Sequence, residues 1–240
     1  MRVTHIYHSG FAVELPVCTL LFDWYTGELP KLRRDLPLVV FVSHEHYDHY
    51  GQCIWPLREQ FVNVCYVLDK DVAKDAPADA RAIAVEPHKT YELQLGTTPG
   101  ANPVALSVQA LESNDEGVAF VVHVCGTSIY FSGDLNSWQW DRPAEENAAS
   151  EMFFRTELSR IAPAPVDLAF VPLDPRLKDP AAGIAAFMDV VGTRALFPMH
   201  YWDRAGEACA LMTDPRLVPY AGVMHFENTC ELPDTSSKPV

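Results

Sequence analysis

The segment Ser43-His44-Glu45-His46-Tyr47-Asp48-His49 follows the apolar run 38–42 and decides how the rest of the chain is interpreted. Three histidines and an aspartate fall within six residues, and each imidazole carries two nitrogens that need partners. In an extended segment the first two histidines lie on the same side, and the turn that follows can direct Asp48 and His49 to a neighbouring point. Imidazole nitrogens and a carboxylate suit zinc, iron or manganese. The segment therefore predicts two adjacent metal positions at the end of a strand.

The remainder of the chain predicts an α/β protein. Short apolar runs separated by turn residues fill the first half, and strands alternate with helices in the second. We expect helices at 50–61, 145–161, 181–191 and 207–212, and strands at 3–7, 11–15, 19–24, 37–43, 63–68, 82–86, 90–95, 104–111, 117–124, 127–132, 167–173, 194–199 and 223–226. Two similar halves packed sheet on sheet, with helices outside, are the expected result. We expect one domain over residues 1–232 and a polar tail at 233–240.

Composition excludes several classes of partner. The 240 residues include 32 acidic and 18 basic side chains, a formal charge of −14, which repels a nucleic-acid backbone. No run approaches the roughly 18 to 20 apolar residues that span a bilayer, so we expect no membrane partner. Six cysteines without a C-x-x-C pair are typical of reduced core thiols, and the N-terminus shows no leader pattern, which predicts a cytoplasmic protein. A small-molecule substrate is the partner that remains, and nothing in the sequence indicates the oligomeric state.

The segment 43–49 resembles the H-x-H-x-D-H signature of the metallo-β-lactamase-fold hydrolases, and the resemblance continues along the chain. Phe131-Ser-Gly-Asp134-Leu is similar to the family's strand-end G-D, whose aspartate bridges two metals. Pro198-Met-His200-Tyr is similar to the late strand-end histidine that completes the second metal position. The resemblance implies an αββα sandwich of two mixed β-sheets with helices on the outer faces, in a single-domain, lactonase-like branch. The ligands that it implies are His44, His46, Asp48, His49, Asp134 and His200.

Five further residues are candidates for supporting the site or contacting substrate. Asp23 ends a predicted strand and matches an early aspartate that, in the family, supports the metal site and orients a histidine. His8 either lines the cleft or is an ordinary turn residue. Tyr201 is a candidate for the rim, and Trp138 either walls the pocket or packs at a sheet edge. Arg176 either holds an anionic group of the substrate or forms a surface ion pair.

The chain departs from the family pattern in one segment. Family members usually carry a further histidine shortly before the strand expected at 117–124, but this chain reads Leu111-Glu-Ser-Asn-Asp-Glu-Gly117. The third ligand beside His44 and His46 must then be Asp115, Glu112 or Ser113, or be replaced by water. We favour Asp115, because Glu112 closely follows a buried strand. We also expect this position to be only partly filled and to accept manganese or iron more readily.

The resemblance implies a metal-dependent hydrolase. A hydroxide formed on the metal would attack an ester, lactone, amide or phosphoester bond of a small molecule, with Asp48 and Asp134 as the catalytic carboxylates. Zinc, as one or two ions, is the expected cofactor, with manganese or iron as alternatives. Two other functions remain open: a mononuclear iron dioxygenase on the same fold, and a catalytically degenerate metal-binding protein. The sequence does not identify the substrate.

Overall fold

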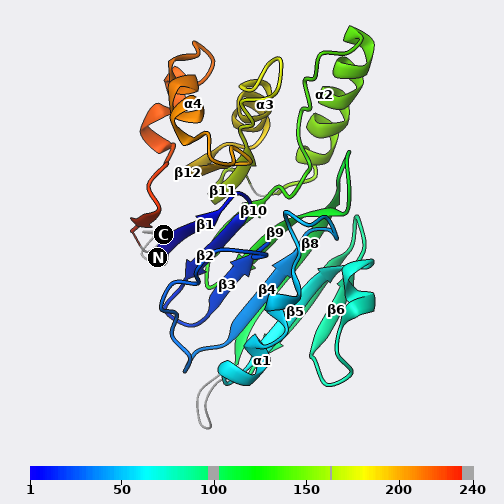
Figure 1. Ribbon diagram of the computed structural model, residues 1–240, viewed down its shortest axis with the longest axis vertical. Helices are drawn as coiled ribbons and strands as arrows, with labels where there is room; N and C mark the ends of the chain where they lie inside the picture. The colour runs from blue at the N-terminus through cyan, green and yellow to red at the C-terminus, as the bar shows by residue number, and fades with distance from the viewer. Residues whose placement is uncertain (97–102, 163, 234–240) are drawn as a thin grey trace.

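The computed structural model describes residues 1–96, 103–162 and 164–233, and these form two β-sheets packed face to face (Figure 1). All but the first residue of the predicted tail, 233–240, lies outside the described residues. The tail and the single-domain boundary therefore stay predictions.

The first sheet has the strand order β13-β1-β2-β3-β4-β5-β6 among the described residues. Strands β13, β1, β2 and β3 pair antiparallel, whereas β3, β4, β5 and β6 pair parallel, so the sheet is mixed. The strands are β1 (Arg2–Tyr7), β2 (Gly10–Glu14), β3 (Thr19–Phe22), β4 (Leu38–Val42), β5 (Val64–Asp69), β6 (Ala82–Val85) and β13 (Thr229–Glu231).

The second sheet has the order β12-β11-β10-β9-β8-β7 over the same described ranges. Strands β7 to β10 pair antiparallel, and β10, β11 and β12 pair parallel, so this sheet is mixed as well. Its strands are β7 (Thr90–Leu95), β8 (Val104–Glu112), β9 (Val118–Val124), β10 (Thr127–Phe131), β11 (Val166–Pro172) and β12 (Thr193–Met199).

Three apolar clusters define the layers. The central one lies between the sheets and contains stacked rings such as Phe22, Phe41 and Phe131, which are fully buried. A second cluster joins the outer face of the second sheet to the helices through residues such as Phe154 and Phe187. The third joins the outer face of the first sheet to the short segment around residues 54–57. The αββα sandwich predicted from the sequence is confirmed.

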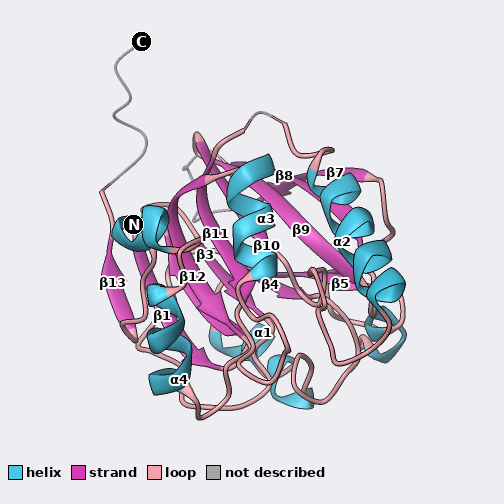
Figure 2. Ribbon diagram, turned by 90° about the horizontal axis from the view of Figure 1, so that it is seen from above, coloured by secondary structure: helices cyan, strands magenta, loops and turns pink. Residues whose placement is uncertain are grey.

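The helices are short and lie outside the sheets (Figure 2). They are α1 (Leu57–Gln60), α2 (Ala144–Leu158), α3 (Ala182–Val190) and α4 (Ala205–Ala210), with 3-10 helices at Gln52–Ile54, Val72–Asp75, Leu211–Thr213 and Val218–Val223. No helix within the described ranges is long and apolar enough to cross a membrane.

Three expectations about local structure are wrong. The helix expected at 50–61 is two short turns, because Pro56 restricts its predecessor and lacks an N–H group. The strand expected at 223–226 is instead the end of a 3-10 helix followed by a single β-bridge between Met224 and Leu196. The last strand within the described residues is β13, which pairs with β1 at the edge of the first sheet. The six cysteines are free thiols, as predicted, but Cys125 and Cys209 are exposed and are therefore not core residues.

Candidate metal centre

The predicted metal ligands come together at one edge of the sandwich, where strands of both sheets end. Strands β3 and β4 run parallel, so Asp23 and the segment 43–49 follow them at the same edge. In the second sheet β10, β11 and β12 also run parallel, which brings Asp134 and His200 to one edge. The carboxyl ends of parallel strands are where ligand sites of open sheets commonly form.

Asp134 lies at the centre of the cluster. Its Oδ1 atom is 3.2 Å from His49 Nε2 and 3.0 Å from His200 Nε2, and its Oδ2 atom is 3.4 Å from His44 Nε2. With metal–nitrogen bonds of about 2.0–2.1 Å, neighbouring ligand atoms of a tetrahedral site are about 3.3 Å apart. The two carboxylate oxygens thus face different imidazoles, Oδ1 those of His49 and His200 and Oδ2 that of His44, whose neighbour along the motif is His46. We call these the His49 position (His49, His200 and Asp134 Oδ1) and the His44 position (His44, His46 and Asp134 Oδ2).

The atoms that face the centre lack hydrogen-bond partners. Among the described side chains, Nε2 of His44, His49 and His200 and Oδ1 of Asp134 are buried without one. A buried polar atom left unpaired costs about 1–3 kcal/mol, so four such atoms in one place need an explanation. Each has a lone pair that a cation accepts. The donor set therefore fits a metal ion with nitrogen and oxygen ligands.

A network behind the histidines sets their orientation. Asp23 accepts hydrogen bonds from the Ser43 amide at 2.8 Å and the Ser43 hydroxyl at 2.6 Å, and its Oδ2 lies 2.6 Å from His49 Nδ1. The Ser43 hydroxyl oxygen lies 2.9 Å from His44 Nδ1. With both Nδ1 atoms donating to this network, both Nε2 lone pairs face the cluster. Asp23 thus lies where the resemblance implied, and Ser43, which had no assigned role, joins it.

Two glycines allow the start of the segment 43–49 to pack closely against the second sheet. A Cβ atom on Gly117 would lie 2.0 Å from the Ser43 carbonyl oxygen, and one on Gly133 would lie 2.8 Å from Ser43 Cβ. Both glycines also have positive φ, +65° and +51° respectively. The amide of Val118 donates to the Ser43 carbonyl at 3.0 Å. The start of β9 is thereby held against the end of β4.

The charged groups of the cluster shift one another's pKa values. Burial alone would lower the pKa of His49, but the carboxylates of Asp134 and Asp23 outweigh it and raise that pKa to about 10. Burial would likewise raise the pKa of Asp134, yet the neighbouring His49 and His200 hold it well below its usual value. The cluster therefore favours a positive charge at its centre, whether a proton or a metal cation supplies it.

Three predicted ligands lie at the periphery. His46 is exposed, and its ring centroid is 4.6 Å from that of His44. Asp48 is half-buried, and although burial opposes it, contact with His8 and His49 lowers its pKa to about 2. Asp115 is at the surface, where partial burial of its carboxyl and the charge of Asp134 raise its pKa, with His46 and His44 opposing. The charges of the cluster thus affect the pKa of Asp115, but its role as a ligand stays a prediction.

Glu112, the alternative to Asp115, faces another cluster. Its Oε2 atom is 4.0 Å from His88 Nε2, and its amide donates to Glu157 at 3.0 Å. Among the described residues, His88, Glu112 and Glu157 form a separate group on that side of β8.

His8 and Trp202 complete one wall of the centre. His8 lies in the turn between β1 and β2, is 1% exposed, and has burial as the main cause of a pKa lowered to about 4. Its ring centroid is 4.4 Å from that of His200 and 3.8 Å from that of Trp202. Sequence reasoning missed Trp202, although its position two residues after His200 was a usable signal.

The other three candidates, Trp138, Tyr201 and Arg176, contact residues around the cluster. Trp138 is buried and donates from Nε1 to the Asp134 carbonyl at 2.9 Å. Tyr201 is buried too, and its hydroxyl lies 2.9 Å from Nδ1 of His5, through which it reaches the His8 turn. Arg176 forms an ion pair with buried Asp174, and its guanidinium lies 5.4 Å from the centre of the Trp202 ring.

A cavity of about 310 Å³ lies on the far side of Trp138, whose Nε1 donates to the Asp134 carbonyl. Asp115 and Trp138 line it on the side of the cluster, and Trp140, Arg142 and Phe153 line it elsewhere. The rings of Trp138 and Trp140 are stacked with an interplanar angle of 12°. A polar and aromatic cavity of this size beside a metal cluster is able to hold a small molecule.

The sequence is similar to several proteins that are all named UPF0173 metal-dependent hydrolases. The chain is 33% identical over 144 residues to a UPF0173 metal-dependent hydrolase from Opitutus terrae, covering 56% of this chain and 63% of that protein. It is 27% identical over 206 residues to one from Hyperthermus butylicus, covering 81% and 80% respectively. A third, from Desulforamulus reducens, is matched over 62% of its length. The chain thus spans less than two thirds of the Opitutus and Desulforamulus proteins. No family model matches it.

Solved structures share the fold. Igni18, a metallo hydrolase from Ignicoccus hospitalis, matches with a TM-score of 0.62 and 17% identity, covering 97% of this chain and 99% of that one. The metallo-β-lactamase fold protein YhfI from Bacillus subtilis matches with a TM-score of 0.54 and 14% identity, over 88% and 93%. CmlA, a diiron β-hydroxylase from Streptomyces venezuelae, matches with a TM-score of 0.61 and 11% identity, over 96% of this chain and 54% of CmlA.

Proposed function

We propose that this chain, which has the metallo-β-lactamase fold and is similar in sequence to the UPF0173 metal-dependent hydrolases, is itself a metal-dependent hydrolase of a small molecule. The bond cleaved is an ester, lactone, amide or phosphoester. Zinc is the proposed metal, because three imidazoles and a carboxylate are borderline ligands that suit it.

One observation carries this proposal. Nε2 of His44, His49 and His200 converge on the two oxygens of Asp134 at 3.0–3.4 Å, in a buried place where they have no hydrogen-bond partners. Although these atoms are so close together, none of them meets the geometry of a hydrogen bond, which a polar network built only for stability would satisfy. Their arrangement supports binding of one or two cations at the edge of the sheets.

The chain's residues have distinct proposed roles around the bound metal. A bound divalent cation lowers the pKa of a water molecule and polarises the oxygen atom under attack. Asp134 would supply one oxygen to each position, because Oδ1 faces His49 and His200 and Oδ2 faces His44. Asp48 stays ionised in the half-buried cleft, where its carboxylate orients or ligates. Trp138 links Asp134 to the adjoining cavity, which receives the substrate.

Metal analysis combined with a hydrolase panel tests the proposal. The protein is purified without added metal, its metal content is measured, and metal-free and reloaded samples are assayed on ester, lactone, amide and phosphodiester substrates. We expect hydrolysis that is lost with the metal and restored by zinc. A His200→Ala variant should be inactive, whereas His123→Ala, which removes an imidazole from β9, should retain activity.

Other outcomes favour the alternative functions. Oxygen consumption by the iron-loaded protein, without hydrolysis, would favour the dioxygenase. Tight metal binding with no turnover on any substrate would favour a catalytically degenerate metal-binding protein. Hydrolysis at an equal rate by the metal-free protein would contradict a metal-dependent mechanism.

A further inference from the structure

We propose that His8 is an additional metal ligand, supplied to the His49 position by the turn between β1 and β2. This inference rests on the proposed function in one respect only, namely that a metal ion binds at this cluster. It adds a third imidazole to those of His49 and His200. The position then has three nitrogens and the Oδ1 atom of Asp134.

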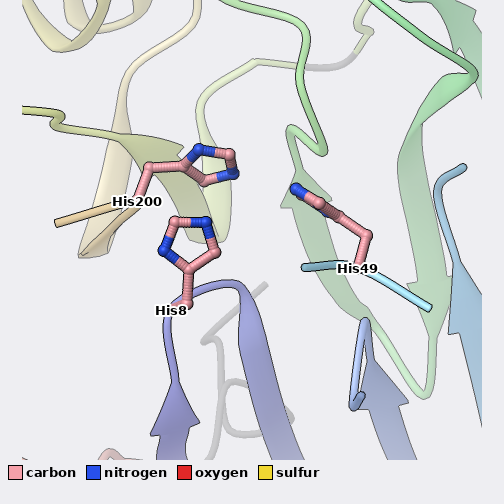
Figure 3. Close-up of side chains that lie close together, drawn as sticks. All are labelled: His8, His49 and His200. Atoms are coloured by element: carbon pink, nitrogen blue, oxygen red, sulfur yellow. The ribbon is translucent and has the colours of Figure 1, made fainter. Parts of the chain in front are cut away.

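The three imidazoles reach the same space from separate segments of the chain. Figure 3 shows His8 and His200 side by side, with the ring of His49 pointing toward them. One nitrogen from each side chain lies within 4.8 Å of the others. The ring centroids are 4.4 Å apart for His8 and His200, and 6.1 Å apart for His8 and His49. Ligand nitrogens around zinc are roughly 3.3 Å apart, so the three side chains would close in by up to about 1.5 Å on binding.

Packing alone does not account for His8. Its side chain is fully buried, and among the described residues neither Nδ1 nor Nε2 has a hydrogen-bond partner. Its Nε2 atom lies 3.5 Å from Oδ2 of Asp48, which is itself a predicted metal ligand. A neutral imidazole buried without partners is destabilising, and a cation between the three histidines would satisfy its lone pair.

The backbone is arranged to deliver these two rings. His8 has a φ of +53° and His200 a φ of +68°, backbone conformations that residues other than glycine rarely adopt. The amide of His200 donates to the carbonyl of His8 at 3.4 Å, and the hydroxyl of Ser9 donates to the carbonyl of Asp48 at 2.6 Å. Strained conformations of this kind persist at functional sites, where surrounding contacts hold them. Here the two hydrogen bonds connect the β1–β2 turn to the end of β12 and to the segment 43–49.

Trp202 restrains the imidazole of His8 from the other side. Its ring centroid lies 3.8 Å from that of His8, with an interplanar angle of 36°. Arg176 in turn lies above the Trp202 ring. Contacts that fix the orientation of a ligand ring are a regular feature of metal sites.

A third imidazole would give the two positions different properties. Four protein ligands are typical of closed zinc sites, whereas sites that react with substrate keep an open place. With His8 the His49 position reaches four ligands even without Asp48, while the His44 position has two imidazoles and one carboxylate oxygen. The His49 position would then hold its ion tightly, and the His44 position would stay accessible to water and substrate.

X-ray absorption at the zinc edge tests the inference on the unmodified protein. The protein is loaded with one equivalent of zinc, and the number of imidazoles around the metal is determined. We expect three, from His8, His49 and His200. A count of two would overturn the inference.

A variant pair tests it independently. Asparagine tolerates positive φ, so His8→Asn should keep the turn while removing the imidazole. We expect zinc affinity to fall roughly 100-fold or more, since even residues that only support a ligand change affinity 10–100-fold, and the imidazole count to fall to two. His123→Asn, the matched control on β9, should change neither. Weaker affinity with the count still at three would assign His8 to hydrogen bonding with Asp48 and overturn the ligand role.

Two further outcomes separate this inference from the proposed function. If His8→Asn does not fold, His8→Gly relieves the positive φ, and added imidazole should restore zinc affinity; no restoration would count against the ligand role. Three imidazoles in a protein that hydrolyses nothing would leave the His8 ligand in place and remove the hydrolase. A wild-type protein that binds no zinc would overturn both.

Discussion

The two proposed metal positions differ in how deeply the fold buries their expected ligands. At the His49 position both histidines are buried, and Asp23 supports His49 from behind. At the His44 position His44 is buried but His46 is exposed, and the expected third histidine is missing from the chain. One Asp134 carboxylate therefore faces both a position with buried histidines and a position with one exposed histidine. Such a pair would combine stable metal binding with an accessible place for substrate.

Replacing the shared carboxylate should have the largest effect, because it belongs to both positions. Asp134→Asn removes the negative charge that faces His44, His49 and His200, so we expect metal to be lost on dialysis and affinity to fall at least roughly 100-fold. The fold should be retained, since Asp134 follows a pre-formed strand. Metal content after dialysis is the measurement. Asp141→Asn, an exposed change, is the control. Unchanged metal content in Asp134→Asn would rule out a ligand role.

The contact that holds the motif between the sheets can be broken at Gly117. An added Cβ would meet the Ser43 carbonyl at 2.0 Å, so Gly117→Ala should lower the free energy of unfolding by about 3 kcal/mol or more. Gly126→Ala is a matched control, because Gly126 also has positive φ but open space around it. That variant should lose only about 1–2 kcal/mol. Denaturant unfolding measures both, and equal losses would show that the contact with Ser43 is unimportant.

The support behind His49 can be weakened without removing a ligand. Asp23→Asn keeps the shape and tolerates the positive φ of Asp23, but it removes the charge beside His49 Nδ1. We expect a loss of about 10–100-fold in affinity for the first zinc ion, measured by competition with a chelator. An affinity equal to that of the wild type would mean that Asp23 supports the fold alone.

The smallest effect on stability is expected at His46. His46→Ala should leave the first zinc ion in place and weaken only the second, because His46 belongs to the His44 position. Since the side chain is exposed, the free energy of unfolding should change by less than about 0.5 kcal/mol. Titration calorimetry resolves the two binding steps. A weakened first step would reverse the order of the two positions.

The fold and the centre of the site were largely predictable from the sequence, because their signals are local. Apolar runs of strand length end in ligand-type residues, so the sequence alone placed His44, His49, Asp134 and His200 at strand ends. The two mixed sheets followed from the resemblance that these residues carry. The convergence of their side chains then depends on parallel pairing, which a strand-and-helix pattern suggests.

Long-range contacts and backbone strain were not predictable. The sequence left open whether His8 lines the cleft or is an ordinary turn residue, because its contact with His200 depends on positive φ at both residues and on the packing of two sheets. The strand expected at 223–226 was wrong for a similar reason. Met224 is buried in the cluster that lies between the second sheet and the helices, and this tertiary contact overrides the apolar pattern.

Anomalous diffraction at the zinc edge tests the difference between the two positions most directly. Crystals of the wild-type protein would be prepared with one equivalent of zinc and then with excess zinc. We predict a single strong peak at the His49 position with one equivalent, and a second, weaker peak at the His44 position with excess. A peak at the His44 position alone with one equivalent, or equal peaks at both, would contradict the proposed order of binding.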